Sequence, residues 1–322
     1  MQAQDPDVEK LLALVKAAGK PSFDQMSPAE ARVAYLAGRD FLQSPAEEVA
    51  SSVDLAIDGP GGRLPLRIYR GAGTTAAAQL PCILYLHGGG WVIGDLDSHD
   101  RLCRRLANRA AACVVAVDYR LAPEHPFPAA LDDAVAALRW LVRADNGLVI
   151  DRTRIAAAGD SAGGTLAAVL ALMGRDGSAP PVMFQALLYP ATDLTCASDS
   201  YRRYTEGVTL TAGVMHWFID HYVPPGVARD DWRLSPLLVS STVGAPPALV
   251  VTVGLDPLSD EGRAYAHKLE NDGVRVLALH LSDQLHGLAM QGRQVRAGDT
   301  MVDMVGVALH AALRNNPPIA AG

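Results

Sequence analysis

The spacing of apolar residues divides the chain into a helical start and a longer part with the texture of an α/β protein. From Val8 to Val15, apolar side chains recur every three or four residues, which is typical of an amphipathic helix. Pro28 is suited to open a second helix that runs through Phe41, because proline is favoured in the first helical turn. The pattern therefore predicts a helical cap segment over residues 1–45.

Beyond residue 50 the pattern changes to short apolar runs of strand length. Residues 53–57 and 64–69 are two such runs, and the Gly-Pro-Gly-Gly stretch between them predicts a tight turn and an antiparallel hairpin at a sheet edge. Six further runs follow at 82–87, 113–119, 154–159, 184–189, 248–254 and 274–281. Because these six runs are continuously apolar, we expect their strands to be buried on both faces.

Stretches of helical length and period separate these runs, at 98–111, 129–144, 162–174, 259–272 and 299–314. Strands that alternate with helices predict a mostly parallel sheet of about eight strands, flanked by helices, in an α/β fold. Residues 191–245 interrupt the alternation with aromatic residues and prolines but no clear strand. They are predicted to form a cap insert within a single domain of residues 46–322.

Composition and charge indicate a protein with a large core and argue against one class of partner. The chain has 322 residues, of which 49% are hydrophobic and 20% are charged, so it has enough apolar material for a large core. The formal net charge of -7 has the wrong sign for binding a phosphate backbone, so no nucleic acid partner is expected.

The N-terminal residues and the cysteines add expectations about location and metals. The first ten residues carry acids where a signal peptide needs basic residues, and no apolar run approaches the roughly 18 residues of a membrane span. We therefore expect a cytoplasmic protein without a membrane anchor. The four cysteines are Cys82, Cys103, Cys113 and Cys196. They show no CxxC pair and no zinc-ligand spacing, so free thiols and no metal site are predicted.

The clearest chemical signal is the sequence Gly159-Asp160-Ser161-Ala162-Gly163, between a predicted strand and a predicted helix. A G-x-S-x-G turn at such a corner exposes the serine hydroxyl above a sheet, and its glycines let strand and helix pass closely. A helix N-terminus at Ser161 also directs backbone N–H groups toward an anion. The motif predicts a nucleophilic serine, against the alternatives of a phosphate-binding loop or a plain turn. Asp160 is expected to have a structural role.

A second motif, His87-Gly88-Gly89-Gly90-Trp91, follows the apolar run CILYL. Consecutive glycines are expected only where the backbone turns sharply or approaches a ligand closely. Acyl transfer needs such an approach, because backbone N–H groups stabilise the oxyanion that forms. A dinucleotide-binding turn is the alternative, but no G-x-G-x-x-G follows a strand here and no acid for a ribose is evident.

With DYRLAPEHPFPAAL between these motifs and GLDPLSDEG and LHG after them, the chain resembles the hormone-sensitive-lipase-like group of α/β-hydrolase esterases. The resemblance covers roughly residues 50–290. It implies an α/β-hydrolase fold with a helical cap and a serine esterase activity. The oxyanion donors that it implies are Gly89, Gly90 and Ala162, and the supporting loop residues are His87, Gly88 and Trp91. Leu255 and Leu288 depart from the residues common in the group, which affects the expected shape of the pocket only.

A serine nucleophile needs a histidine base that is held by a carboxylate, and in α/β-hydrolases the chain order is Ser, acid, His. Of the histidines after Ser161, only His286 is predicted to lie in a loop just beyond the last strand. Asp256 directly follows a predicted strand, and Pro257 disfavours regular helix at that point. The predicted catalytic residues are therefore Ser161, His286 and Asp256. Asp283, three residues before His286, is the alternative acid.

These motifs predict a carboxylic ester hydrolase that forms a covalent acyl-enzyme on Ser161. A small-molecule ester is the expected substrate, and no cofactor is required. The alternatives are a non-catalytic small-molecule receptor on the same fold, a true long-chain lipase, and an amide or peptide hydrolase.

Apolar side chains from both cap segments are expected to roof Ser161. They are Phe23, Met26, Leu36, Phe41, Met215, Trp217 and Phe218. A finite pocket of this kind favours short to medium acyl chains of about four to eight carbons. The run 274–281, as an exposed edge strand, leaves a homodimer open.

Overall fold

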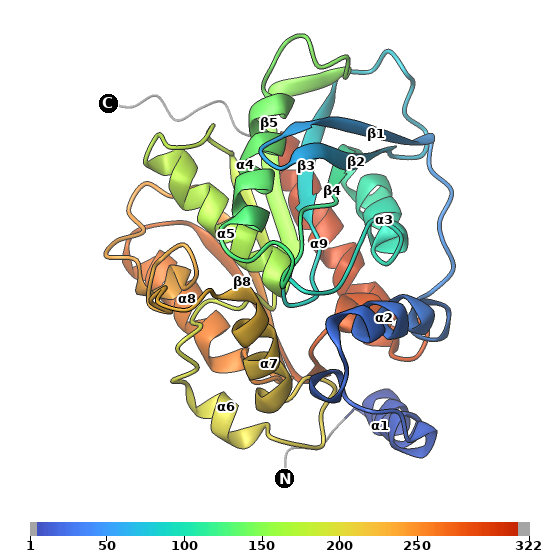
Figure 1. Ribbon diagram of the computed structural model, residues 1–322. Coiled ribbons are helices and arrows are strands. Elements are labelled where there is room, and N and C mark those ends of the chain that lie inside the picture. The colour runs from blue at the N-terminus through green and yellow to red at the C-terminus, as the bar shows by residue number, and fades with distance from the viewer. Residues whose placement is uncertain (1–4, 315–322) are drawn as a thin grey trace.

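The computed structural model describes residues 5–314, which form an eight-stranded sheet between two layers of helices (Figure 1). The strands are β1 (Ser51–Gly59), β2 (Gly62–Arg70), β3 (Leu80–Leu86), β4 (Cys113–Val117), β5 (Ile150–Asp160), β6 (Phe184–Leu188), β7 (Ala248–Leu255) and β8 (Val276–Leu285). Their order in the sheet is β1-β2-β4-β3-β5-β6-β7-β8. β1 and β2 form the expected antiparallel hairpin, β2 lies antiparallel to β4, and the other neighbours are parallel. The predicted α/β fold with a mostly parallel sheet is confirmed.

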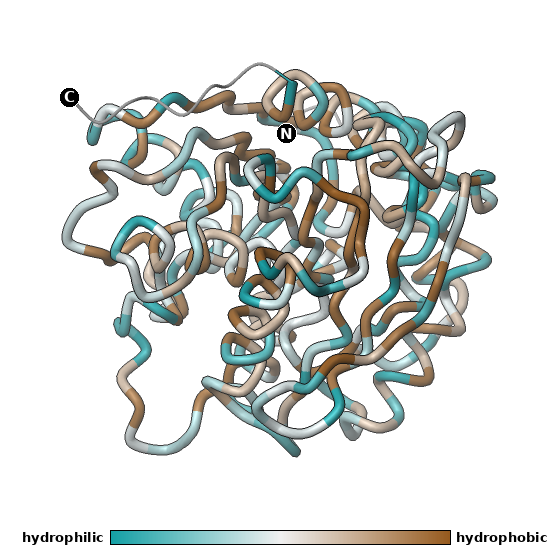
Figure 2. Tube along the Cα trace, turned by 90° about the horizontal axis from the view of Figure 1, so that it is seen from above, coloured by the Kyte–Doolittle hydropathy of each residue, from teal (hydrophilic) through white to brown (hydrophobic). Residues whose placement is uncertain are grey.

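The central strands are buried on both faces, because their residues are apolar at every position of β3 and β4 and at all but Gln185 of β6. In β3, Leu84 and Leu86 join the core on one face of the sheet, whereas Ile83 and Tyr85 join the core on the other face. In Figure 2, hydrophobic residues follow the central segments of the chain and hydrophilic residues are more frequent at the periphery. The continuous apolar runs thus place the middle of the sheet in the interior.

The expectation of burial on both faces is wrong for β8. This strand pairs with β7 alone among the described strands, so it forms one edge of the sheet. Several of its residues are exposed, and the side chain of Leu277 is 56% exposed. An apolar run does not by itself distinguish a central strand from an edge strand.

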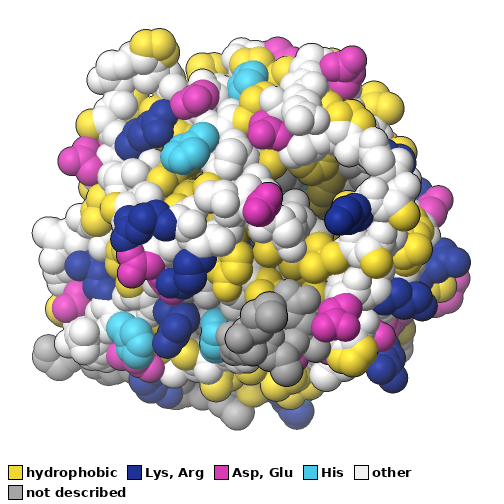
Figure 3. Space-filling view, turned by 90° about the horizontal axis from the view of Figure 1, so that it is seen from below, with side chains coloured by type: hydrophobic (Ala, Val, Ile, Leu, Met, Phe, Trp, Pro, Cys, Tyr) yellow, Lys and Arg dark blue, Asp and Glu magenta, His cyan; other side chains and the backbone are white. Residues whose placement is uncertain are grey.

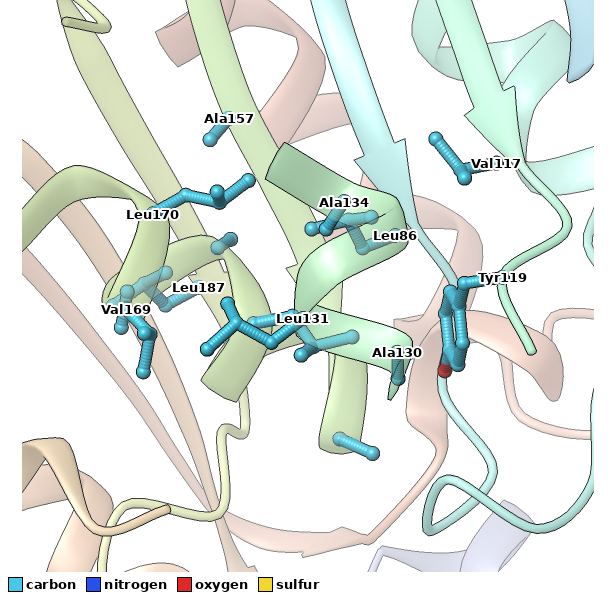
Figure 4. Packing of buried hydrophobic residues seen from close by; sticks show 14 of the residues in the cluster. Leu86, Val117, Tyr119, Ala130, Leu131, Ala134, Ala157, Val169, Leu170 and Leu187 are labelled. Atoms are coloured by element: carbon cyan, nitrogen blue, oxygen red, sulfur yellow. The ribbon is translucent and has the colours of Figure 1, made fainter. Parts of the chain in front are cut away.

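Two helical layers cover the sheet. One contains α4 (Ala129–Leu141), α5 (Ala162–Arg175) and α8 (Ser259–Asn271), and the other contains α3 (Asp100–Ala110) and α9 (Arg296–Arg314). Figure 4 shows the first core at close range, with Leu131 of α4 and Leu170 of α5 near the strand residues Leu86, Ala157 and Leu187. This packing fixes the start of α5, and therefore Ser161, against the ends of the central strands.

The segment before the sheet is helical, in agreement with its apolar periodicity. It contains α1 (Pro6–Ala18), the short 3₁₀ helix η1 (Phe23–Gln25) and α2 (Pro28–Leu42). The Asp5 carboxylate caps α1 by accepting the amide of Asp7 at 2.7 Å, and Ser27 and Glu30 form a reciprocal capping box at the start of α2. Residues 1–4 of the predicted cap segment lie outside the described residues.

Residues 191–245 connect β6 to β7 and, as predicted, contain no strand. They include α6 (Asp199–Arg203), α7 (Ala212–Tyr222) and the 3₁₀ helix η2 (Pro236–Leu238). α7 contacts η1, and the rings of Phe23 and Phe218 have centroids 6.3 Å apart. Figure 1 shows both segments at the same end of the sheet. Two parts of the chain that are distant in sequence therefore meet there.

The chain returns from β8 through the 3₁₀ helix η3 (Leu288–Met290) into α9, which has 19 residues. α9 also carries charged residues, among them Arg296, Asp299 and Asp303. Among residues 5–314, no helix combines the length and the apolar character that crossing a membrane requires.

Candidate active site

Ser161 occupies a strained corner between β5 and α5. Its backbone has φ 53° and ψ -121°, a conformation that non-glycine residues adopt only where the surrounding structure holds them. Side chains at Gly159 or Gly163 would overlap backbone atoms, those of Gly163 and Leu86 respectively, so both positions require glycine. The amide of Ser161 donates to the carbonyl of Leu188 on β6 at 2.8 Å. The G-x-S-x-G sequence is thus a tight turn that packs against the end of β3 and is hydrogen-bonded to β6.

His286 and Asp256 complete a hydrogen-bonded relay with Ser161. The Ser161 hydroxyl lies 2.9 Å from Nε2 of His286, and Nδ1 of His286 lies 2.7 Å from Oδ2 of Asp256. Asp256 is fully buried, and its Oδ1 accepts the amide of Leu258 at 2.9 Å. Because an ionised carboxylate only accepts hydrogen bonds, His286 donates from Nδ1 and presents an acceptor Nε2 to the serine. This arrangement can remove a proton from the hydroxyl.

Local chain geometry explains why these side chains meet. β7 ends at Leu255 and β8 ends at Leu285, so Asp256 and His286 both follow the carboxyl ends of adjacent parallel strands. Asp283, the alternative acid, still lies within β8 and interacts with the side chain of Gln284 at 3.1 Å. The structure therefore brings Asp256, and not Asp283, to His286.

Other histidines that follow Ser161 lie in unrelated contacts. Nδ1 of His221 bonds to the carbonyl of Trp217 within α7, and Nδ1 of His280 lies 2.9 Å from the hydroxyl of Thr252. Their positions agree with the selection of His286 from its place in the chain.

The glycine loop, formed by residues 88–92 with three consecutive glycines at its start, lies next to the G-x-S-x-G turn and has amides without partners among the described residues. Gly89 and Gly90 have φ values of 120° and 58°, which only glycine adopts readily. The amides of Gly89, Gly90 and Ala162 donate to no acceptor within the described part of the chain. A side chain at Gly90 would overlap the ring of Phe218, so α7 packs directly on this loop. These three amides are the implied oxyanion donors.

A cluster of buried polar side chains connects the glycine loop to the G-x-S-x-G turn. Oδ1 of Asp160 accepts the amide of Gly88 at 2.9 Å and the hydroxyl of Tyr85 at 2.6 Å, and the ring of His99 lies 3.4 Å from the same carboxylate. Burial by itself would raise the pKa of Asp160, but His99 and Tyr85 together hold it below its usual value. The expected structural role of Asp160 is therefore specific, because it connects the residue before the nucleophile to the loop of the implied donors.

His87, the first residue of the HGGGW motif, stabilises the glycine loop through contacts of its ring. Its Nδ1 donates to the carbonyl of Gly88 at 2.8 Å, and its ring stacks on Tyr119 with centroids 4.1 Å apart. Burial, aided by nearby His99, lowers the pKa of His87 to about 4. His87 is thus a neutral structural residue near neutral pH.

Glu261 is a buried carboxyl in the GLDPLSDEG motif, from which no role near the site was predicted for it. It is 1% exposed, and its Oε1 accepts the amides of Thr192 at 2.7 Å and Asp193 at 3.2 Å. Burial raises the pKa of Glu261 well above its usual value. These bonds fasten α8, which follows the Asp256 loop, to the start of residues 191–245. The sequence signal was its place in the GLDPLSDEG motif, five residues after Asp256.

Five of the seven predicted roof residues pack together, whereas Leu36 and Phe41 lie outside their cluster. Phe23, Met26, Met215, Trp217 and Phe218 belong to or pack against the same hydrophobic cluster. The prediction for Phe41 is wrong, because this residue lies at the last turn of α2 with its side chain 45% exposed. Figure 3, which views the molecule from below Figure 1, shows a hollow with largely hydrophobic walls on the face where the cap segments lie.

No group of three or more His, Cys, Asp or Glu side chains suited to a metal ion occurs among residues 5–314. The four cysteines carry free thiols, and Cys82 and Cys113 are register partners on β3 and β4. The described site presents a serine, a histidine, a carboxylate and backbone amides.

Comparison with known proteins agrees with the fold. Residues 83–290 match the family model described as alpha/beta hydrolase fold. An ethyl acetate hydrolase of Pseudomonas putida is 39% identical over 96% of this chain and 99% of its own length. Esterase LipI of Mycobacterium tuberculosis is 40% identical over 85% of this chain and 86% of its own length.

Solved structures show the same relationship. A thermostable esterase from Pseudomonas putida superposes with a TM-score of 0.93 at 33% identity, covering 98% of this chain and 99% of the other. The hyperthermophilic esterase from Pyrobaculum calidifontis gives a TM-score of 0.89 at 36% identity, covering 96% and 99% of the two chains. The chain belongs to the α/β-hydrolase fold family, which confirms the resemblance inferred from its motifs.

Proposed function

We propose that the protein is a serine carboxylesterase that hydrolyses short- to medium-chain acyl esters through a covalent acyl-enzyme. The observation that carries this proposal is the relay from Ser161 through His286 to Asp256, with distances of 2.9 and 2.7 Å. The names of an ethyl acetate hydrolase and an esterase among its relatives support the same reaction class. The side chains and amides of the site supply nucleophile, base and oxyanion donors, so the proposed reaction uses no cofactor.

In the first half-reaction His286 accepts the proton of Ser161 at Nε2 while the serine oxygen attacks the ester carbonyl. Asp256 stabilises the imidazolium that forms and keeps its ring in the productive orientation. The negative charge on the carbonyl oxygen is met by the amides of Gly89, Gly90 and Ala162. His286 then protonates the departing alcohol and leaves the acyl group on the serine.

In the second half-reaction the same histidine activates water. The water attacks the acyl carbonyl, the amides again hold the oxyanion, and His286 returns its proton to Ser161 as the carboxylic acid leaves. His286 begins and ends the cycle neutral, so one group serves as base and acid in both steps.

The proposed limit on acyl length follows from the packing at the cap. Phe218 is 4% exposed and lies against Gly90, and Phe23 lies beside it. Each methylene that enters an apolar pocket contributes about 0.8 kcal/mol until the end of the pocket is reached, after which overfilling is unfavourable. We therefore expect turnover to be highest for acyl chains of about four to eight carbons.

A series of p-nitrophenyl esters of increasing acyl length tests the proposal, with Ser161→Ala as the matched inactive variant. We expect kcat/KM to peak within the stated range and the variant to lose nearly all turnover. Binding without turnover in the wild-type protein would instead indicate a receptor. Faster cleavage of emulsified long-chain triglyceride would indicate a lipase, and preferential cleavage of p-nitroanilides would indicate an amidase.

We also propose that two copies pair along β8. This strand is an edge of the described sheet, so its outer backbone groups are available to another strand, and Leu277 is 56% exposed. Sedimentation velocity should show a dimer that Leu277→Lys weakens, while Val243→Lys, at another exposed apolar position, leaves it intact. A wild-type monomer at micromolar concentration would contradict the pairing.

A further inference from the structure

The glycine loop that carries two of the implied oxyanion donors is held in an unfavourable backbone conformation. Besides the two glycines, Trp91 has φ 61°, which is uncommon for a bulky residue. Such a conformation persists only when neighbouring groups fix it from several sides. The carbonyl of Trp91 accepts the amide of Ala122 at 2.9 Å, so the loop lies against the segment that follows β4.

Arg32, on helix α2 of the N-terminal segment, donates hydrogen bonds both to the glycine loop and to the segment that follows β4. Its Nε donates to the carbonyl of Val92 at 2.8 Å, and its Nη2 donates to the carbonyl of Ala122 at 2.9 Å. Val92 and Ala122 are both fully buried, so these carbonyls have little access to water. One guanidinium therefore joins the glycine loop to the neighbouring segment two residues after Gly90.

A carboxylate holds the guanidinium in this position. Glu124 accepts Nη1 and Nη2 of Arg32 at 2.8 and 2.6 Å, which is a bidentate pair. Hydrogen bonds from Arg32 lower the pKa of Glu124 to about 2. The pair is thus charged across the neutral pH range, and the orientation of the fork is fixed.

We propose that Arg32 is a positioning residue that fixes the oxyanion loop, so that the N-terminal segment acts on the chemical step as well as on substrate size. The inference rests on the proposed ester hydrolysis. Arg32 itself lies on the outer side of the loop, bound to backbone carbonyls and to Glu124, and its effect passes through the loop to the amides of Gly89 and Gly90.

The geometry needs arginine and not just a positive charge. Three acceptors lie around one planar fork, whereas the ammonium of lysine is a compact group on a flexible stem and does not reproduce this arrangement. Without the guanidinium, the buried carbonyls of Val92 and Ala122 lose their donors, which favours a shift of the loop. The oxyanion forms only during reaction, so the shift should affect the transition state more than substrate binding.

The test compares Arg32→Met with Arg39→Met. Arg39 lies on the same helix, its side chain has the same exposed fraction of 31%, and it also donates to a backbone carbonyl, that of Asp97 at 3.1 Å. It makes no bond to the glycine loop among the described residues. The measurements are kcat and KM for p-nitrophenyl butyrate, the affinity for a trifluoromethyl ketone that forms a hemiketal with Ser161, and the melting temperature.

We expect Arg32→Met to lower kcat at least about tenfold, with KM within about twofold, because removing a whole oxyanion donor costs about 10² to 10³ in kcat. Affinity for the trifluoromethyl ketone should fall by a similar factor, since its hemiketal also needs the oxyanion hole. Arg32→Lys should show a smaller loss, and Arg39→Met should keep kcat within about twofold of the wild type.

An unchanged kcat in Arg32→Met, or equal losses in Arg32→Met and Arg39→Met, would overturn the inference. If Arg32→Met does not fold, Arg32→Lys decides the question, and a folded lysine variant with wild-type kcat and ketone affinity would also overturn it. A wild-type protein that hydrolyses no ester would contradict the proposed function instead, so the two failures are distinguishable.

Discussion

The indole of Trp91 stacks on the ring of Tyr222, with centroids 4.4 Å apart and ring planes inclined by 4°. Trp91 follows the glycines of the proposed oxyanion loop, and Tyr222 is the last residue of α7. The two residues are 1% and 2% exposed, so the stack is part of the interior. It couples the packing of residues 191–245 to the position of the loop.

Removing the ring of Tyr222 should therefore affect both stability and turnover. We expect Tyr222→Ala to lower the free energy of unfolding by about 3 to 5 kcal/mol, the usual cost of truncating a buried aromatic residue, and to lower kcat. Tyr222→Phe keeps the stacked ring and should change stability by less than about 1 kcal/mol. Urea denaturation and ester kinetics on both variants check this, and equal effects of the two substitutions would contradict a role for the stack.

The choice between the two candidate acids is tested by a pair of isosteric substitutions. Asp256→Asn should lower kcat by about 10³ to 10⁴, because the imidazole of His286 loses the acceptor that orients it. Asp283→Asn is the matched control and should keep activity near the wild-type level, since its carboxylate contacts Gln284. The reverse ranking in steady-state kinetics would transfer the acid role to Asp283.

The dependence of stability on pH should report the burial of His87. Its pKa is about 4 in the folded protein and about 6.5 in the unfolded chain, so between these values the unfolded state binds the additional proton. Stability from this group is complete above pH about 6.5 and should fall by about 3 kcal/mol as the pH decreases to about 4.

His87→Gln should flatten this part of the stability profile relative to the wild type. His267→Gln is the control, because that side chain is 70% exposed and lies on α8, away from the glycine loop. Urea denaturation at several pH values measures both. A wild-type slope in His87→Gln would show that His87 does not carry the effect.

The roof of the site should control the preference for acyl length. Phe218→Ala removes a buried ring next to Gly90, so we expect the maximum of kcat/KM to move to longer acyl chains, by about two to four carbons. Phe41→Ala is a suitable control because Phe41 is 45% exposed and outside the hydrophobic cluster. The p-nitrophenyl ester series gives both profiles, and an unshifted maximum in Phe218→Ala would exclude this residue from the pocket.

Local sequence patterns were sufficient for the parts of the site that depend on local geometry. Ser161 was predictable because a G-x-S-x-G turn between a strand and a helix has one steric solution, and Asp256 and His286 because each follows the end of a strand. The sequence favoured Asp256 and kept Asp283 as the alternative acid. Excluding Asp283 depends on β8 continuing to Leu285, and strand boundaries are not visible in an apolar run.

Contacts between distant parts of the chain could not be predicted, because they produce no periodic pattern in the sequence. The bonds of Asp160 to Gly88 and of Arg32 to Val92 join residues 72 and 60 positions apart, and neither pair belongs to a motif that specifies the other partner. Leu277 on β8 and Phe41 on α2 were misjudged for a related reason. Their apolar character indicated burial, but burial depends on what lies beside an edge strand or a helix end.

The most direct test of the central claim is labelling with a fluorophosphonate followed by mass spectrometry of the digested protein. A phosphonyl fluoride reacts with a serine only when a base activates the hydroxyl and donors hold the oxygen on phosphorus. We predict a single adduct on Ser161, formed in proportion to the loss of esterase activity and absent from His286→Ala. An adduct on another residue, or full esterase activity after complete labelling of Ser161, would contradict the assignment of Ser161 as the nucleophile.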